Sequence, residues 1–281
     1  MKGRDIVVDG IRLHVAEAGA GPALFLLHGL AATNATWEHT MPVFAERWRV
    51  IAPDLPGHGR SAKPNAPYTI DFYAGVIRSL GRELGVDEAI VAGNSLGGQI
   101  ALELACAYPR WTRALVLAAP AGGFPVAMRP LGWAIGAVDS PRLMRMALER
   151  SVQHAFYDPR SPGCLARREI LAERVAAEDF PSFARAVSRS IAGALGAGAR
   201  PLHALTQPML LVWGRQDRLV GLSRSRQLLR DVPHARLVLL DRCGHVPMLE
   251  YPEVFNRIVD EFLRAVEAAP RPHVRTAVGA P

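Results

Sequence analysis

The stretch AIVAGNSLGGQIALELACAYP, residues 89–109, decides the fold of this chain. Its first five residues are apolar, as in a strand buried on both faces, and residues 97–109 have the composition of a helix. Between them, Gly93-Asn94-Ser95-Leu96-Gly97 matches the pattern G-x-S-x-G. The stretch therefore predicts a strand, a tight turn that lifts Ser95 out of the chain, and a helix that leaves the turn.

This context indicates that Ser95 is a nucleophile. A serine in such a turn has a strained backbone, so the residues two positions away must lack bulk, and Gly93 and Gly97 do. The helix that follows directs the positive end of its dipole at the serine oxygen. A glycine-rich turn of this kind also occurs in nucleotide-binding folds. A Walker phosphate loop is excluded, because no Gly-Lys-Ser/Thr follows.

The rest of the chain alternates between strand-like and helix-like segments, which predicts an α/β fold with a mostly parallel sheet. Residues 5–17 hold two short alternating runs around Asp9-Gly10, a hairpin signal that places an antiparallel hairpin at the front edge of this sheet. Residues 71–84 have helical spacing, with Asp71 as the expected N-cap. Further strands are expected in 23–29, 49–59, 114–120, 208–214 and 236–245, and further helices in 223–232 and 252–269.

Residues 122–200 interrupt this alternation. They contain no strand-like run, and three segments within them have helical patterns. We therefore expect residues 1–121 and 201–267 to form one α/β core, with residues 122–200 inserted between two of its strands as a helical cap. Residues 268–281 have no periodicity and are expected to be a disordered tail.

The composition is that of a globular protein. The chain has 281 residues, of which 49% are hydrophobic, and no segment approaches about 18 consecutive apolar residues, which predicts no membrane span. The start MKGRDIVVDG lacks the apolar run of a signal peptide, so a cytoplasmic location is expected. The three cysteines are scattered, and no metal-ligand spacing is present. The sequence thus predicts neither a metal nor a cofactor.

The charge pattern favours a small-molecule substrate over a nucleic acid as the partner. Lysine and arginine number 33 against 26 acidic residues, and all the basic residues except Lys2 and Lys63 are arginines. No basic run exceeds two residues and acidic residues are interleaved, which is typical of a solvated surface. Nucleic-acid binding is therefore not expected. A homodimer is compatible with the sequence.

In these features the chain resembles an α/β-hydrolase, and the resemblance covers residues 5–265. It rests on His28-Gly29 after a buried strand, on the segment DLPGHGRS at 54–61, and on the G-x-S-x-G turn. The resemblance implies a catalytic triad in the chain order serine, acid, histidine. A serine at the turn, where some relatives carry aspartate, disfavours the opening of halides and epoxides.

The acid and the base are predicted from their positions after late strands. His245 lies in a loop after the last predicted strand and is the expected base. Asp217 follows the strand 208–214 and is the expected acid, although an aspartate there could also serve only as a turn or helix cap. Asp54 and Asp241 are weaker candidates. Some relatives carry the acid after the strand 114–120, where no carboxylate is found here.

The resemblance also implies two oxyanion donors. One is the backbone N–H of Leu96, directly after the nucleophile, and the other is that of Leu30, directly after His28-Gly29. His28 is expected to brace this loop. The lipase-type HGGG sequence is absent.

The predicted function is a carboxylesterase-like serine hydrolase that cleaves ester or lactone bonds of small to medium apolar substrates. Two alternatives stay open. The GNS turn, the stretch LERSVQHAFYDP and the ending CGH…LEYPEVFNRIVDEFL resemble hydrolases that split carbon–carbon bonds in meta-cleavage dienoates, but those usually carry Trp where Val246 stands. Some proteins of this fold are instead ligand receptors or cofactor-free oxygenases.

Arginines in the cap separate the first two functions. A dienoate brings a carboxylate into a closed site and needs an inward cation, whereas a neutral ester makes an inward arginine costly. Residues 122–200 hold 11 arginines and 7 acidic residues. We expect that no arginine among 142–174 points into the cavity near Ser95. The four to examine are Arg145, Arg167, Arg168 and Arg174.

Overall fold

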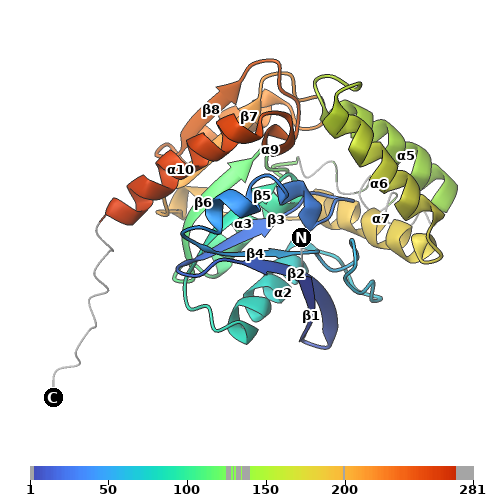
Figure 1. The fold of residues 1–281 in the computed structure, drawn as a ribbon, viewed down its shortest axis with the longest axis horizontal. Coiled ribbons are helices and arrows are strands. Elements are labelled where there is room, and N and C mark those ends of the chain that lie inside the picture. Colours follow the sequence, from blue (N-terminus) through green and yellow to red (C-terminus); the bar gives the residue numbers. More distant parts are fainter. Residues whose placement is uncertain are drawn as a thin grey trace.

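The computed structural model describes residues 3–124, 128, 130, 134, 140–198 and 200–269. At its centre lies one sheet of eight strands (Figure 1). The strands are β1 (Gly3–Val8), β2 (Ile11–Ala18), β3 (Ala23–Leu27), β4 (Arg49–Pro53), β5 (Ala89–Asn94), β6 (Thr112–Ala118), β7 (Met209–Gly214) and β8 (Arg236–Leu240). Their order in the sheet is β1-β2-β4-β3-β5-β6-β7-β8.

The sheet is mixed, as predicted. The pairs β1–β2 and β2–β4 are antiparallel, and every pair from β4 to β8 is parallel. The hairpin turns at Asp9 and Gly10, whose φ angles are 47° and 78°. Two successive residues with positive φ are what a two-residue hairpin loop requires, and Asp-Gly tolerates them. The predicted front-edge hairpin is therefore confirmed.

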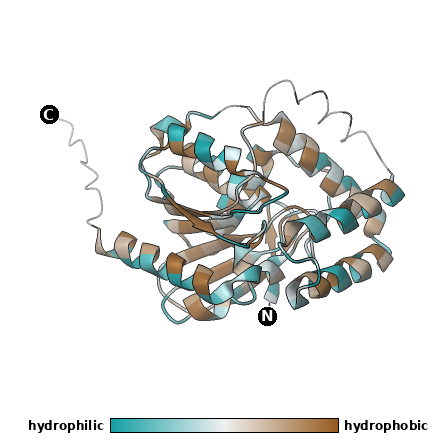
Figure 2. Ribbon diagram, turned by 90° about the horizontal axis from the view of Figure 1, so that it is seen from above, coloured by the Kyte–Doolittle hydropathy of each residue, from teal (hydrophilic) through white to brown (hydrophobic). Residues whose placement is uncertain are grey.

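Helices cover both faces of the sheet. On one face lie α2 (Ile70–Glu83), α3 (Leu96–Ala107) and α8 (Leu222–Asp231), and on the other lie α1 (Met41–Phe44), α9 (Pro247–Glu250) and α10 (Pro252–Ala268). Strand β3 shows why: Phe25 and Leu27 pack on the first side, while Leu24 and Leu26 pack on the second. Strand β3 is accordingly hydrophobic throughout, and the sheet lies between the two helical layers (Figure 2).

Three helices follow β6 and precede β7, within the segment expected to form the cap. They are α5 (Pro141–Ala155), α6 (Pro162–Ala176) and α7 (Phe180–Gly196), and they lie together at one side of the sheet (Figure 1). They share a small core that includes Leu148, Leu171, Phe183 and Val187. This core supports the prediction of a distinct cap, whose boundaries stay a prediction.

Some local predictions need correction. The N-cap of α2 is Thr69, whose hydroxyl accepts a hydrogen bond from the Phe72 N–H at 3.2 Å, and not Asp71. Asp71 lies in the first helical turn, where its charge still favours the helix dipole. The tail that is predicted to be disordered covers residues 268–281, and residues 270–281 lie outside the described ranges. No helix among the described residues is long and apolar enough to cross a membrane.

Candidate active site

The turn at Ser95 has the backbone strain that the sequence predicts. Ser95 lies between β5 and α3 with φ 54° and ψ −115°. A Cβ on Gly93 would lie 2.3 Å from the Gly97 carbonyl oxygen, and a Cβ on Gly97 would lie 2.2 Å from that of Leu27. Both positions thus exclude any larger residue, because the turn packs against itself and against the end of β3. Strain of this kind is typical of functional sites.

The acid and base candidates are in direct contact. His245 Nδ1 donates a hydrogen bond to Asp217 Oδ2 at 2.7 Å, and both side chains are almost fully buried. The bond fixes the neutral imidazole with its proton on Nδ1, which leaves Nε2 free to accept a proton. His245 and Ser95 line the same cavity. The structure thus brings together all three residues of the predicted triad.

Asp217 uses its two carboxylate oxygens differently. Oδ1 accepts hydrogen bonds from the N–H groups of Leu219 at 2.8 Å and Val220 at 2.9 Å, which closes the turn after β7. The indole of Trp213 anchors the same turn by donating to the Val220 carbonyl at 2.8 Å. The structural and catalytic interpretations of Asp217 are therefore compatible, because the turn orients the oxygen that contacts His245.

Three residues that the sequence analysis missed hold the loop of His245. Asn94 Nδ2 donates to the His245 carbonyl at 3.0 Å, and Gln216 Oε1 accepts from the Cys243 N–H at 3.2 Å. Glu250 Oε1 accepts from the Gly244 N–H at 2.7 Å. Asn94 is the first of the two variable residues of the G-x-S-x-G pattern, and Glu250 lies five residues after His245. Neither position carries a chemical signal without the fold.

The two predicted oxyanion donors lie beside Ser95. Leu30 and Leu96 both line the cavity, and among the described residues neither backbone N–H has a hydrogen-bond acceptor. The loop of Leu30 passes close to the nucleophile, since a Cβ on Gly29 would lie 3.2 Å from Ser95 Cβ. The geometry suits a backbone oxyanion hole, and the role of both amides stays a prediction.

His28 braces the loop of Leu30, as expected. Its Nε2 accepts from the Leu55 N–H at 2.9 Å, so Nδ1 carries the proton and donates to the Gly29 carbonyl at 2.8 Å. Burial lowers the pKa of His28 to about 4, because a charged imidazole would be desolvated there. His28 is therefore neutral at pH 7 and joins the end of β3 to the loop after β4.

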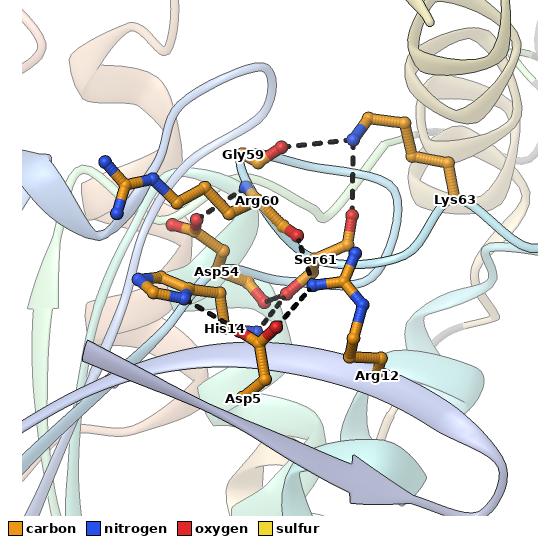
Figure 3. A network of polar contacts seen from close by, with 8 residues as sticks. All are labelled: Asp5, Arg12, His14, Asp54, Gly59, Arg60, Ser61 and Lys63. Carbon is orange, nitrogen blue, oxygen red and sulfur yellow. Dashed lines mark hydrogen bonds and ion pairs between the residues drawn. The ribbon is translucent and has the colours of Figure 1, made fainter.

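The two alternative acids have other partners. Asp54 Oδ2 accepts from the Arg60 N–H at 2.8 Å, and its Oδ1 accepts from the Asn34 N–H at 2.7 Å. The Asp54 carbonyl also accepts from Ser61 Oγ at 2.6 Å, within a polar network that ties this loop to β2 (Figure 3). Asp241 is exposed and pairs with Arg215 at 2.5 Å. Both therefore have structural contacts that do not involve His245.

A cavity of about 640 Å³ opens at Ser95, between the sheet and α5–α7. This position, at the carboxyl ends of the parallel strands, is where ligands bind in open α/β sheets. Much of its wall is apolar, which suits an apolar substrate. The apolar lining includes Leu148, Val152, Phe156, Leu171, Phe183 and Leu195.

The expectation about cap arginines is wrong for two of the four. Arg167 and Arg174 line the cavity, whereas Arg145 and Arg168 are exposed on the cap surface. Sequence reasoning failed here because helical periodicity alone does not fix which face of α6 turns toward the sheet. Both inward arginines have acidic partners. Arg167 pairs with Glu38, and Arg174 pairs with Asp179.

The pairs of these arginines also attach the cap to the core. Arg167 Nη2 donates to the Ala35 carbonyl at 3.1 Å, in addition to its ion pair with Glu38. Asp179 also pairs with Lys63 at 3.0 Å, and burial lowers the pKa of Lys63 to about 8. The nearby positive charge of Arg174 acts in the same direction. Arg167 and Arg174 therefore lie on the cavity wall with their positive charges partly offset by acidic partners.

No cluster of three or more histidine, cysteine, aspartate or glutamate side chains suited to a metal occurs in the described part of the chain. The three cysteines, Cys106, Cys164 and Cys243, are free thiols. Cys243 is buried two residues before His245, and its burial raises the pKa of the thiol. A buried, protonated thiol is a poor nucleophile, so Cys243 does not compete with Ser95 for that role.

Comparison with known proteins agrees with this architecture. A family model described as "Alpha/beta hydrolase family" matches residues 24–258. A 2-hydroxymuconate semialdehyde hydrolase from a Pseudomonas species is 32% identical over 279 residues, which cover 95% of both chains. The relatives of this chain therefore include an enzyme named as a hydrolase of 2-hydroxymuconate semialdehyde.

Two solved structures are similar along almost their whole length. A 2-hydroxy-6-oxo-6-phenylhexa-2,4-dienoate hydrolase from a Rhodococcus species has a TM-score of 0.78 and 28% identity, covering 94% of this chain and 98% of that one. An N-acyl homoserine lactone degrading enzyme has a TM-score of 0.77 and 27% identity, covering 92% of this chain and all of that one. The fold, the turn at Ser95 and the family match agree, and this chain is a member of the α/β-hydrolase family.

Proposed function

We propose that this protein is a serine hydrolase that cleaves ester or lactone bonds of small to medium apolar substrates through an acyl-enzyme. In this proposal Ser95 is the nucleophile, His245 is the general base and Asp217 orients the imidazole. The contact between His245 and Asp217 beside a strained serine is the observation that carries the proposal. It is the arrangement that serine needs, because a neutral hydroxyl is a weak nucleophile without a base.

The first half-reaction forms the acyl-enzyme. His245 Nε2 takes the proton of Ser95 Oγ while Oγ bonds to the substrate carbonyl carbon, and Asp217 stabilises the imidazolium that results. The N–H groups of Leu30 and Leu96 donate to the oxyanion, each lowering the barrier by about 3 kcal/mol. When the tetrahedral intermediate collapses, the carbon–oxygen bond to the leaving group breaks and His245 protonates the departing alcohol.

The second half-reaction restores the enzyme. A water molecule gives its proton to His245 Nε2 and adds its oxygen to the acyl carbon, forming a second tetrahedral intermediate. Its collapse releases the carboxylic acid and returns the proton to Ser95 Oγ. The same donors serve both steps, so no other group of the chain is needed to complete the cycle.

The cavity supports a neutral, apolar substrate. Its two cap arginines carry acidic partners, Glu38 for Arg167 and Asp179 for Arg174, so their charge is offset without a substrate. The guanidinium of Arg174 also lies 5.4 Å from the ring centroid of Phe183, which stabilises a cation against an aromatic wall. Because these two cations are already paired, the cap wall of the cavity does not need an anionic ligand to offset them.

A second candidate function is the hydrolysis of carbon–carbon bonds in dienoates. The observation that favours it is the place of Arg167 and Arg174 on the cavity wall, where each has a buried Nε with no hydrogen-bond partner in the described residues. A substrate carboxylate could use these donors. The named relatives that act on such compounds favour the same candidate.

A substrate panel tests both candidates. Wild type would be assayed with p-nitrophenyl esters of increasing acyl length, with lactones, and with a meta-cleavage dienoate. For the ester function, we expect the highest kcat/KM on a neutral ester or lactone. Ser95→Ala and His245→Ala should each lower kcat by on the order of 10⁴ or more without unfolding the protein, since the triad acts as a unit.

Three results of the panel would contradict the proposal. Faster turnover of the dienoate than of every ester would favour the carbon–carbon candidate. Activity of Ser95→Ala or His245→Ala within about tenfold of wild type would exclude the proposed triad. A folded wild type that turns over nothing in the panel would favour a binding protein or a cofactor-free oxygenase.

A further inference from the structure

The carboxylate of Glu250 joins two segments that are far apart in the sequence. Its Oε1 accepts a hydrogen bond from the Gly244 N–H at 2.7 Å, and its Oε2 accepts one from the Tyr157 N–H at 2.7 Å. Gly244 precedes His245, and Tyr157 lies two residues beyond the end of α5 in the cap. Hydrogen bonds from N–H groups to a charged carboxylate are about twice as strong as neutral ones.

The same two segments also touch directly. The His245 N–H donates to the Ala155 carbonyl at 2.7 Å. A Cβ on Gly244 would lie 2.5 Å from that same carbonyl oxygen and 2.9 Å from the Tyr157 nitrogen, so no side chain fits between the segments. Gly244 is also pressed from the other side, because a Cβ on Gly214 would lie 2.0 Å from its carbonyl oxygen. The end of α5, the loop of His245 and the end of β7 are therefore packed backbone against backbone.

We propose that Glu250 is a positioning residue that holds the catalytic base and the end of α5 together as one unit. This inference rests on the proposed function, since it assigns Glu250 a role through His245. Glu250 itself does not line the cavity and does not touch the substrate in this proposal. It keeps the His245 loop in register with Ser95 by accepting hydrogen bonds from both segments at once.

The size of the expected effect follows from the geometry of proton transfer. His245 must bring Nε2 within hydrogen-bond reach of Ser95 Oγ, and a displacement of about 1 Å can lower a rate by roughly 100-fold. The bond to Asp217 limits rotation of the ring, but it does not fix the backbone that carries it. The backbone is held by Asn94, by Ala155 and, through Gly244, by Glu250.

The test compares Glu250→Gln with Glu253→Gln. Glutamine keeps one acceptor oxygen but presents an NH₂ group to the second N–H donor, so one of the two bonds is lost. Glu253 is exposed in the first turn of α10 and serves as the matched control. The probes are the best p-nitrophenyl ester of the panel and a fluorophosphonate, which reports the reactivity of Ser95 without reference to the natural substrate.

We expect Glu250→Gln to lower kcat and the rate of fluorophosphonate labelling by about 10- to 100-fold, with KM within about threefold of wild type. Glu253→Gln should leave both rates within about twofold. Glu250→Asp keeps the charge with a shorter reach, so it should retain more of the labelling rate than Glu250→Gln does. This second variant also carries the test if Glu250→Gln fails to fold.

The inference is overturned if wild type is labelled at Ser95 and Glu250→Gln is labelled at the same rate. It is also overturned if Glu250→Gln raises KM alone, or if Glu250→Asp is as slow as Glu250→Gln. An equal loss of labelling in Glu253→Gln would overturn it as well, because the effect would then not depend on Glu250. A folded wild type that is not labelled at all contradicts the proposed function itself, and this inference with it.

Discussion

Asn94 donates one hydrogen bond from its side-chain amide to the backbone carbonyl of His245 at 3.0 Å and another to that of Ala118, also at 3.0 Å. The residue directly before the nucleophile therefore carries part of the loop that bears the base. The amide is buried, so neither carbonyl could exchange this partner for bulk water. Asn94, which does neither acid–base nor nucleophilic chemistry, is thus one of the residues that fix the His245 loop relative to Ser95.

Replacing Asn94 by alanine tests this relationship. Asn94→Ala leaves the buried His245 carbonyl without a donor, whereas the Ala118 carbonyl still accepts from the Ser95 N–H at 3.1 Å. We expect kcat to fall about tenfold as the His245 loop shifts. Asn256 is a matched control, because it is also buried and its Nδ2 donates to the His39 carbonyl at 2.8 Å, away from the cavity. Asn256→Ala should lower the melting temperature comparably while kcat stays within about twofold. Equal kcat losses in both variants would contradict a specific role for Asn94.

Asp217→Asn tests the acid. Asparagine can keep the turn bonds to Leu219 and Val220 through its oxygen, but its NH₂ group faces Nδ1 and favours the wrong imidazole tautomer. We expect kcat to fall by about 10⁴, as such a change does in a serine triad. The measurement is kcat on the best ester, with circular dichroism to confirm the fold.

The two other aspartates provide the contrast for Asp217. Asp241→Asn should leave kcat within about twofold, since the exposed pair with Arg215 is worth at most about 1 kcal/mol. Asp54→Asn should act mainly on stability, because Asp54 accepts from the Asn34 and Arg60 N–H groups. A silent Asp217→Asn beside a kcat loss of about 10³-fold or more in Asp54→Asn would assign the acid to Asp54 instead.

The cavity arginines separate the two candidate substrate classes. Arg167→Gln and Arg174→Gln should leave kcat/KM on a neutral ester within about threefold, because their guanidinium groups are already paired. On an anionic dienoate, either change should cost about 100-fold if that arginine holds the carboxylate. Arg145→Gln and Arg168→Gln, both on the exposed surface, are the controls and should be silent on both substrates. A large loss on the neutral ester would show that these pairs position the cap.

The nucleophile turn was predictable because its chemistry is local. Gly93 is required by its close approach to Gly97 within the same turn, and the G-x-S-x-G pattern indicates the strand before Ser95 and the helix after it. Gly97 belongs to the same pattern, although the atom it approaches is the Leu27 carbonyl oxygen at the end of β3. The order of the triad then narrowed the base to His245 and the acid to Asp217. To predict these two residues it is enough to know which segments are the late strands, and the alternation of strand-like and helix-like segments along the chain indicates them.

The supporting contacts were not predictable for the opposite reason. Glu250 and Asn94 act through backbone groups 93 and 151 positions away, and a backbone N–H or carbonyl has no signature in the sequence. The prediction about the cap arginines is wrong for another reason. Polar residues occur all around α6, so its periodicity does not show that Arg167 and Arg174 turn inward. Thr69 was missed as the cap of α2 because Asp71 is also a good cap residue two positions later.

His58 gives a pH-dependent prediction outside the active site. Its Nδ1 donates to the Pro56 carbonyl at 3.0 Å, and its buried Nε2 has no partner in the described residues. Burial lowers the pKa of His58 to about 3, and the nearby His28 ring, 5.4 Å away between centroids, acts in the same direction. In the unfolded chain the pKa returns to about 6.5. Between about pH 3 and pH 6.5, His58 is therefore neutral in the folded state and protonated in the unfolded state.

The stability that this contributes is fully present above pH 6.5 and is lost as the pH falls from there toward 3. Each pH unit in this range costs about 1.4 kcal/mol for the one proton that the unfolded state takes up. His58→Phe removes the titration and keeps a ring against Phe183, at the cost of the bond to Pro56, worth about 1 kcal/mol. We expect the variant to be slightly less stable than wild type at pH 7 and more stable at pH 4. Urea unfolding at pH 7, 5.5 and 4 measures the free energy of unfolding of both proteins. The same pH dependence in both would contradict the prediction, because His58 would then bind a proton equally in the folded and unfolded states.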